Sequence, residues 1–193
     1  MVDLRSERTL GLVGSILLLV GGFVGVIPYI GAVIGSVSLV GMILVLIALK
    51  GIGDKLGDDR PFKYYLYSVV IAFVGLVVLV VFVLAGILML PEHGEFSDPF
   101  AMVGIGMIIT AFILFVVFLV LGVYFEKQAW DAVYELTGVK EFRETAKWLW
   151  WGALTAIILV GLILLLVAAI YQVIAFANLP EEIEGNPQGE VFA

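Results

Sequence analysis

The only histidine of this chain lies in a short acidic segment, and this is the first group of residues that could do chemistry. His93 has three carboxylates nearby, at Glu92, Glu95 and Asp98. An imidazole and carboxylates together can bind a divalent metal ion. The segment also contains one Gly and two Pro, so it fits an acidic loop rich in turns as well. We favour the loop over a metal site.

Elsewhere the chain offers no set of residues for catalysis. It contains no cysteine, which excludes disulfides and thiolate metal sites. No nucleophile can be combined with a general base and an orienting partner, and no basic tail indicates nucleic-acid binding. We therefore expect a protein that is not an enzyme, needs no cofactor and does not bind nucleic acid.

The composition indicates a membrane protein. Of the 193 residues, 63% are hydrophobic and only 14% are charged, whereas soluble globular chains have about 25% charged and roughly 45–50% apolar residues. One soluble core of this size could not cover so much apolar surface. We expect an all-α integral membrane protein with a single transmembrane domain over residues 1–193.

Five helices are predicted to cross the bilayer. Residues 9–49 carry no charge and as one helix would measure about 60 Å, twice the hydrocarbon thickness, so we expect Pro28 to divide them into two spans. The predicted spans cover residues 10–27, 31–49, 65–90, 100–125 and 148–178, followed by an acidic outer tail at 179–193.

The segment between the fourth and fifth spans, residues 126–147, is polar, but Trp130, Val133 and Tyr134 follow helical spacing. Gly138 could supply a left-handed cap that ends a helix. Two alternatives fit: a short amphipathic helix at the cytoplasmic interface, or a helical extension of the fourth span with a solvated polar face. Our predicted fold is a bundle of five transmembrane helices with the short amphipathic helix before the fifth.

The basic residues predict the orientation. All ten Lys and Arg residues lie at the N-terminus or around 50–63 and 127–147, and short basic segments are retained in the cytoplasm. The segments around Pro28, at 91–99 and at 180–193 contain none. We expect a multi-pass plasma-membrane protein with a cytoplasmic N-terminus and an extracellular C-terminus.

No charged residue falls inside a predicted span, which argues against a proton-coupled transporter. Uncharged polar side chains do occur there, including Gln172, Thr155 and Ser36. The amide of Gln172 needs partners in a dry medium. It is expected mainly to hydrogen-bond between helices, and the alternative is that it lines a small cavity.

Glycines and aromatic residues predict helix packing and membrane depth. Gly21 with Gly25, and Gly31 with Gly35, form two G-x-x-x-G pairs, which let helices approach closely within the chain or between two copies. Aromatic rings favour the headgroup level. The expected interface anchors are Tyr64, Tyr65, Trp148, Trp150 and Trp151.

Several short motifs share their order with a known family. They are Leu10-Gly11-Leu12-Val13-Gly14-Ser15, Ile27-Pro28, Leu46-Ile47-Ala48-Leu49-Lys50, Thr137-Gly138-Val139 with Phe142, and Ala175-Phe176. Over nearly its whole length the chain resembles an archaeal membrane-protein family known only as domain of unknown function 996. The resemblance implies an archaeal plasma-membrane protein and brings no catalytic residues. In span count and orientation alone, the chain is also similar to the Yip family of five-span proteins.

The sequence favours a structural or accessory membrane component that acts through protein or lipid contacts. Its expected partners are membrane lipids, and another membrane protein or a second copy of the chain. The alternative is a channel or carrier for a small neutral solute, with Gln172 and the Ser and Thr hydroxyls lining its path.

Overall fold

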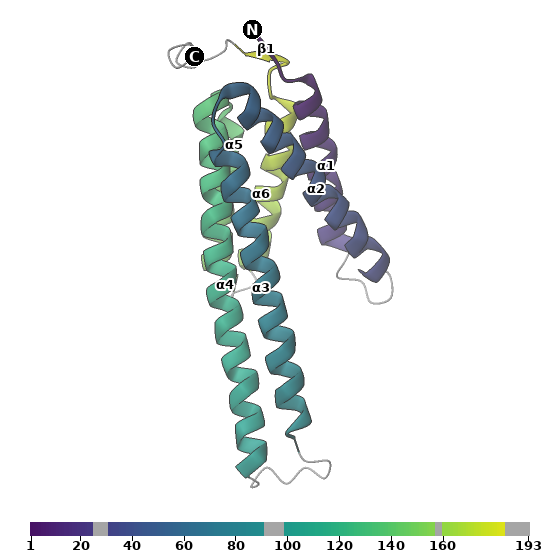
Figure 1. Cartoon of the computed structure of the whole chain (residues 1–193), viewed down its shortest axis with the longest axis vertical. Coiled ribbons are helices and arrows are strands. Elements are labelled where there is room, and N and C mark those ends of the chain that lie inside the picture. The colour runs from purple at the N-terminus through teal and green to yellow at the C-terminus, as the bar shows by residue number, and fades with distance from the viewer. Residues whose placement is uncertain (25–30, 91–98, 157–159, 184–193) are drawn as a thin grey trace. The chain divides into compact units, whose positions relative to one another are not determined.

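The computed structural model describes residues 1–24, 31–90, 99–156 and 160–183 (Figure 1). Its elements in chain order are β1 (Val2–Asp3), α1 (Arg5–Val24), α2 (Gly31–Leu56), α3 (Arg60–Leu88), α4 (Pro99–Thr137), α5 (Lys140–Leu154), α6 (Val160–Ala177) and β2 (Glu182–Ile183). The chain divides into two compact units. We call Met1–Leu66 with Phe125–Ala193 the terminal unit, and Tyr67–Tyr124 the hairpin unit.

Apart from the two short strands, the described structure is helical. Four helical segments are long and apolar enough to cross a membrane: Ser36–Leu56, Arg60–Leu88, Pro99–Thr137 and Val160–Ala177. The prediction of an all-α protein with membrane-spanning helices is therefore confirmed. The tight turn expected at Pro28 lies outside the described residues.

The single helix expected over residues 148–178 is wrong. Helix α5 ends at Leu154 and α6 begins at Val160. The two helices run antiparallel, because Phe142 near the start of α5 packs on Phe176 near the end of α6, at 5.1 Å between ring centroids. At the other end, a Cβ added at Gly152 would lie 2.8 Å from the Leu165 side chain. A helical hairpin thus replaces the fifth span, and the missing side chain at Gly152 permits its close packing.

The structure decides between the two alternatives for the segment that follows the fourth span. Helix α4 continues without a break to Thr137, so residues 126–137 are the helical extension of that span and not a separate amphipathic helix. Gly138 follows with φ +71°, the left-handed conformation expected for a cap. Helix α5 then starts at Lys140, eight residues before the predicted start of the fifth span.

The two ends of the described chain lie together, contrary to the expectation of termini on opposite faces. Strands β1 and β2 pair antiparallel, with Val2 opposite Ile183. The Glu181 carboxylate also forms ion pairs with Arg5 at 3.0 Å and Arg8 at 3.2 Å. The α5–α6 hairpin explains the error, since the extra reversal returns the C-terminal segment to the N-terminal side.

A cluster of four aromatic side chains forms the centre of the terminal unit. Trp130 stacks on Phe142 at 5.8 Å between ring centroids and meets Tyr65 and Phe176 edge-on. All four rings are buried. They come from α5, α6 and the parts of α3 and α4 that belong to the terminal unit, so this aromatic cluster joins these four segments.

Helices α1 and α2 complete the terminal unit as an antiparallel pair. A Cβ added at Gly41 would lie 2.7 Å from the Gly14 carbonyl oxygen, so the two backbones are nearly in contact there. Gly11 of α1 lies directly against the Phe176 ring. These small residues let α1 pack between α2 and α6.

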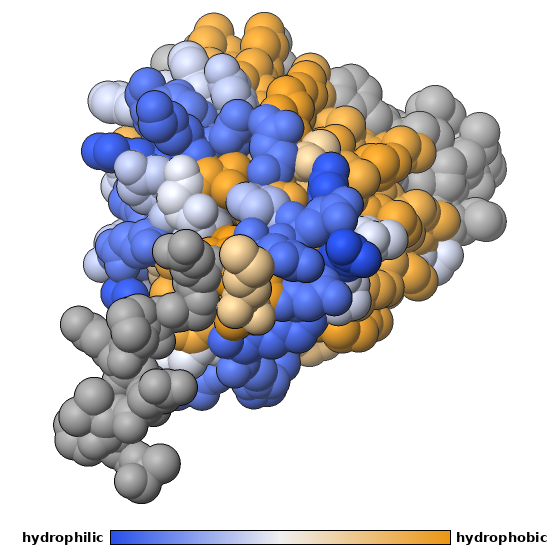
Figure 2. All heavy atoms as spheres, turned by 90° about the horizontal axis from the view of Figure 1, so that it is seen from above, coloured by the Kyte–Doolittle hydropathy of each residue, from blue (hydrophilic) through white to orange (hydrophobic). Residues whose placement is uncertain are grey.

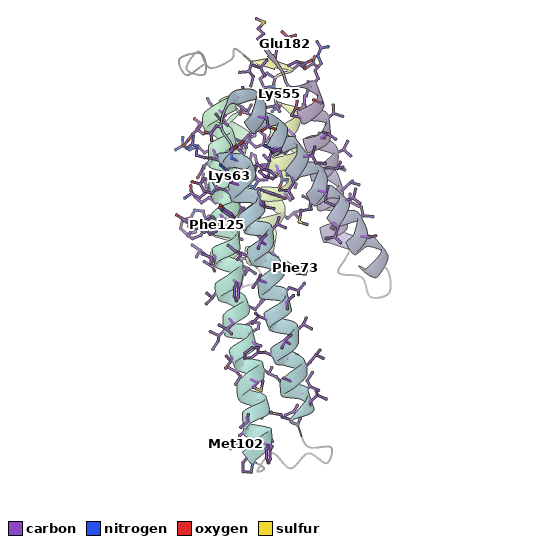
Figure 3. All side chains as sticks on the ribbon, viewed as in Figure 1. Lys55, Lys63, Phe73, Met102, Phe125 and Glu182 are labelled. Carbon is purple, nitrogen blue, oxygen red and sulfur yellow. The ribbon has the colours of Figure 1, made fainter. Side chains whose placement is uncertain are left out.

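The hairpin unit consists of residues 67–88 of α3 and 99–124 of α4. Its described residues include no charged side chain. A Cβ added at Gly86 would lie 2.7 Å from the Gly104 carbonyl oxygen, so the two helices are in close contact there. Most other side chains point away from the pair, including Phe73 and Met102 (Figure 3). Such apolar exposure suits a lipid environment.

Candidate functional site

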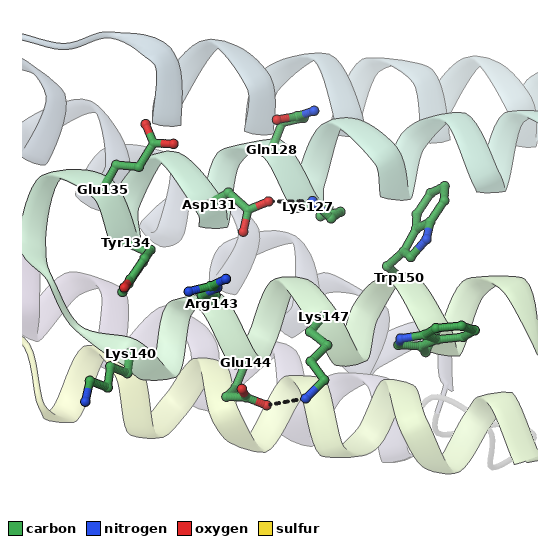
Figure 4. A pocket seen from close by; sticks show the side chains of 11 residues that line it. Lys127, Gln128, Asp131, Tyr134, Glu135, Lys140, Arg143, Glu144, Lys147 and Trp150 are labelled. Carbon is green, nitrogen blue, oxygen red and sulfur yellow. Dashed lines mark hydrogen bonds and ion pairs between the residues drawn. The ribbon is translucent and has the colours of Figure 1, made fainter.

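The described residues form a polar groove between the last turns of α4 and most of α5, which we call the α4–α5 groove (Figure 4). Its volume is about 960 Å³. It is lined by Lys127, Gln128, Asp131, Tyr134 and Glu135 of α4, and by Lys140, Arg143, Glu144, Lys147, Trp150 and Trp151 of α5. All of these residues belong to the terminal unit.

Helical periodicity explains why the groove lies here. On α4 the groove residues 127, 131 and 135 are spaced four apart, and on α5 the residues 140, 143 and 147 are spaced three or four apart, so each set lies on one face of its helix. Other faces of the two helices carry Trp130 and Phe142 of the aromatic cluster, both fully buried. Burying the aromatic faces therefore leaves the charged faces to line the groove together.

The groove has an excess of positive charge. Each of its three carboxylates already has a cation partner: Asp131 pairs with Lys127 at 2.5 Å, Glu144 with Lys147 at 3.4 Å, and Glu135 with Arg60 at 3.0 Å. Within the described part of the chain, no carboxylate lies within 4.0 Å of the side-chain nitrogens of Lys140 or Arg143.

The guanidinium of Arg143 lies over the Tyr134 ring, 5.5 Å from its centroid. This cation–π contact orients Arg143 without neutralising its charge. Two tryptophans, Trp150 and Trp151, close the opposite end of the groove, and Trp151 is 53% exposed. The groove therefore offers two unneutralised cations at one end and amphipathic rings at the other.

A second group of charges ties the N-terminal segment to α2. The Glu7 carboxylate is buried and accepts hydrogen bonds from Lys55 Nζ at 2.7 Å and from the Ser6 hydroxyl at 2.8 Å. Burial opposes ionisation of Glu7, but these hydrogen bonds outweigh it and lower the pKa of the carboxyl below its usual value. Lys55 also donates to the Asp3 carbonyl at 2.7 Å, so this group holds β1 in place.

Viewed from the end at which β1 lies, hydrophilic side chains gather on one face (Figure 2). All ten Lys and Arg residues of the chain belong to the terminal unit. Three basic segments that are far apart in the sequence are thus part of one compact structure.

Among the polar residues predicted inside the membrane, Gln172 makes the contact expected of it. Its amide donates to the Ser15 hydroxyl at 3.0 Å, joining α6 to α1, and both side chains are buried. The Thr155 hydroxyl instead donates to the Trp151 carbonyl at 2.7 Å and is half-buried just after the end of α5. Ser36 is exposed on α2.

The structure describes the packing of one of the four predicted packing glycines, Gly21. Gly25 lies outside the described residues, and for Gly31 and Gly35 only the helical backbone is described. Gly21 packs directly against Ser38, so α1 and α2 are close at this point.

The predicted aromatic anchors occupy different environments. Tyr65 is buried against Trp130 and therefore belongs to the aromatic cluster, not to a lipid interface. Tyr64 is half-buried beside Phe125. Trp148 is half-buried with Lys147 over its ring, whereas Trp150 and Trp151 line the groove.

The metal site considered at His93, Glu92, Glu95 and Asp98 lies outside the described residues. Among the residues that are described, no group of three or more His, Cys, Asp or Glu side chains could hold a metal ion.

Comparison with known proteins gives the family. Residues 37–170, more than half of the chain, match the family described as "Protein of unknown function (DUF996)". The chain belongs to the DUF996 family. A relative at 31% identity, the uncharacterized protein MJ1644 of Methanocaldococcus jannaschii, aligns over 185 residues, which are 96% of this chain and 98% of the relative. No solved structure matches the chain significantly. The predicted resemblance to DUF996 is therefore confirmed.

The α4–α5 groove was missed by the sequence analysis. A signal for it exists, since charges at 127, 131 and 135 alternate with the buried positions 129, 130, 132 and 133 at helical spacing. The same alternation appears in 140–147. These charges were interpreted only as markers of orientation.

Proposed function

We propose that this DUF996 protein is a structural or accessory component of the plasma membrane that acts through contacts with lipids and other membrane proteins, without catalysing a reaction. One observation carries the proposal: the described hairpin unit exposes apolar side chains along its length and has no charged residue, while every Lys and Arg belongs to the terminal unit. This division suits a protein whose hairpin unit is surrounded by lipid, while the charged end of the terminal unit makes polar contacts.

The orientation follows from the same division. Because short basic segments stay in the cytoplasm, we place the charged end of the terminal unit there. The pairing of β1 with β2 then supports a cytoplasmic location for residues 181–183 as well as for the N-terminus. Six helices in three antiparallel hairpins would meet this requirement, in place of five full spans.

The absence of native cysteine makes the orientation testable with single cysteine reporters. An impermeant thiol reagent on intact cells should label Glu95→Cys and spare Lys55→Cys, Lys140→Cys and Glu182→Cys. Labelling of Glu182→Cys in sealed cells, with Lys55→Cys protected, would contradict the proposed orientation.

The buried hydrogen bond between Gln172 and Ser15 supports a packing role for the most polar membrane side chain. The purified protein, reconstituted in sealed liposomes, should therefore cause no flux of protons, K⁺, Na⁺ or small neutral solutes such as glycerol and urea. Protein-dependent flux that disappears in Gln172→Leu would overturn the accessory function and favour the carrier instead. Gln172→Asn is the control that keeps an amide at this position.

A further inference from the structure

The α4–α5 groove begins with Lys140 at the level of other charged groups of the terminal unit and extends deeper along the helices to Lys147. Arg8, the last charge of α1, donates to the Ala177 carbonyl at the end of α6 at 2.8 Å. From the contacts of Phe142 with Phe176 and of Gly152 with Leu165, Lys147 lies at the level of residue 171 of α6. At 1.5 Å per residue, this is about 9 Å below the level of Ala177.

At the same level, the outer face of α6 is apolar. Ile170 and Ile174 are both exposed there. One side of the terminal unit is thus suited to lipid chains at a depth where the groove side carries Arg143 and Lys147. Arg143 has no carboxylate partner among the described residues and lies near the level of Ile174, so a polar ligand would offset the cost of unpaired charge near hydrocarbon.

We propose that the α4–α5 groove binds the headgroup of an anionic membrane phospholipid. Its phosphate is held by Lys140 and Arg143, the two groove cations without a carboxylate partner among the described residues. The acyl chains leave past Trp151 and Leu154, which are exposed and apolar on the same helix. The inference rests on the proposed membrane function and names the lipid class that this function uses.

The chemistry of the groove favours this ligand. Arg forms paired hydrogen bonds to phosphate oxygens, and Lys supplies a point charge. Trp rings prefer the boundary between headgroups and acyl chains. The volume of about 960 Å³ is large enough for a headgroup with its first methylene groups.

The test measures lipid binding to the full-length protein in mild detergent by native mass spectrometry. We expect dioleoyl phosphatidylglycerol to bind at least tenfold more tightly than dioleoyl phosphatidylcholine. The double substitution Lys140→Gln with Arg143→Gln should remove this preference, since each cation near a phosphate contributes a several-fold effect. The control, Lys50→Gln with Lys63→Gln, removes the same charge outside the groove and should retain the preference.

Three outcomes would overturn the proposal: equal binding of the two lipids, equal losses in the test and control variants, or displacement of the lipid by millimolar glycerol 1-phosphate, which would indicate a soluble ligand. Arg143→Lys should restore most of the binding. If the double variant does not fold, Trp151→Ser, at an exposed position, should weaken binding of both lipids but leave thermal unfolding unchanged. If the lipid-binding proposal fails, the accessory function is still tested separately by the liposome flux, which the groove variants do not affect.

Discussion

Replacing Phe142 by Ala should destabilise the terminal unit more than any lipid-facing substitution of the same kind. Phe142 is 0% exposed. Its ring centroid lies 5.8 Å from that of Trp130 and 5.1 Å from that of Phe176 in the aromatic cluster. Removing a fully buried Phe costs about 3–5 kcal/mol, from the lost transfer energy and the cavity that remains.

The matched control is Phe73→Ala in the hairpin unit, where the ring is 67% exposed. A ring that faces lipid or detergent in the folded protein gains little from burial, so we expect a change of less than about 1 kcal/mol. For a chain of this size, the Phe142 variant should lose on the order of 10 °C in thermal midpoint. The measurement is thermal unfolding in detergent, followed by tryptophan fluorescence.

The Phe142 substitution also tests how the α4–α5 groove is positioned. Because the aromatic cluster fixes α5 against α4, a looser cluster should weaken lipid binding in the groove without changing any groove charge. Equal thermal midpoints for the Phe142→Ala and Phe73→Ala variants would refute the reasoning, since the cluster would then contribute no more than a lipid-facing ring.

Two further predictions concern the α1–α2 pair. Gly41→Ala should lower stability by about 1–3 kcal/mol, because its Cβ would lie 2.7 Å from the Gly14 carbonyl oxygen. The control is Gly106→Ala in α4, where an added Cβ would have no atom within 4 Å. This variant should gain up to about 1 kcal/mol in stability through helix propensity. Thermal unfolding of both variants tests whether the clash at Gly41 outweighs that gain. Glu7→Gln should lower the free energy of unfolding by about 1–2 kcal/mol at pH 7, because Lys55 loses its charged partner. The loss stays this small because Lys55 can still reach water. Since the folded pKa of Glu7 is lowered from 4.5, the difference in stability between parent and variant should be present above that pH and disappear as the pH falls through the folded pKa. A difference that persists in acid would contradict an ionised Glu7 as its source.

The sequence alone determined the class of protein and one helix cap, at Gly138. Continuous apolar stretches and sparse charge indicate membrane helices wherever the rest of the chain lies. Gly138 could be assigned to a helix cap because its left-handed conformation is a local property of one residue. The segregation of all ten basic residues is equally visible in the chain, and the structure places them in one unit.

Only the tertiary structure decided where the apolar chain reverses and which faces meet. Residues 148–178 satisfy their hydropathy equally well as one long helix or as a hairpin, so the choice depends on packing between Phe142 and Phe176, which no local pattern encodes. The same holds for the pairing of Val2 with Ile183, which brings the chain ends together. Tyr65 shows the consequence for single residues: an aromatic ring beside a basic segment suits a lipid interface or a buried core, and contact with Trp130 determines which. Burial of Trp130 and Phe142 in the aromatic cluster therefore left the charged side chains of α4 and α5 to line the groove, whereas the sequence had supplied only its charges.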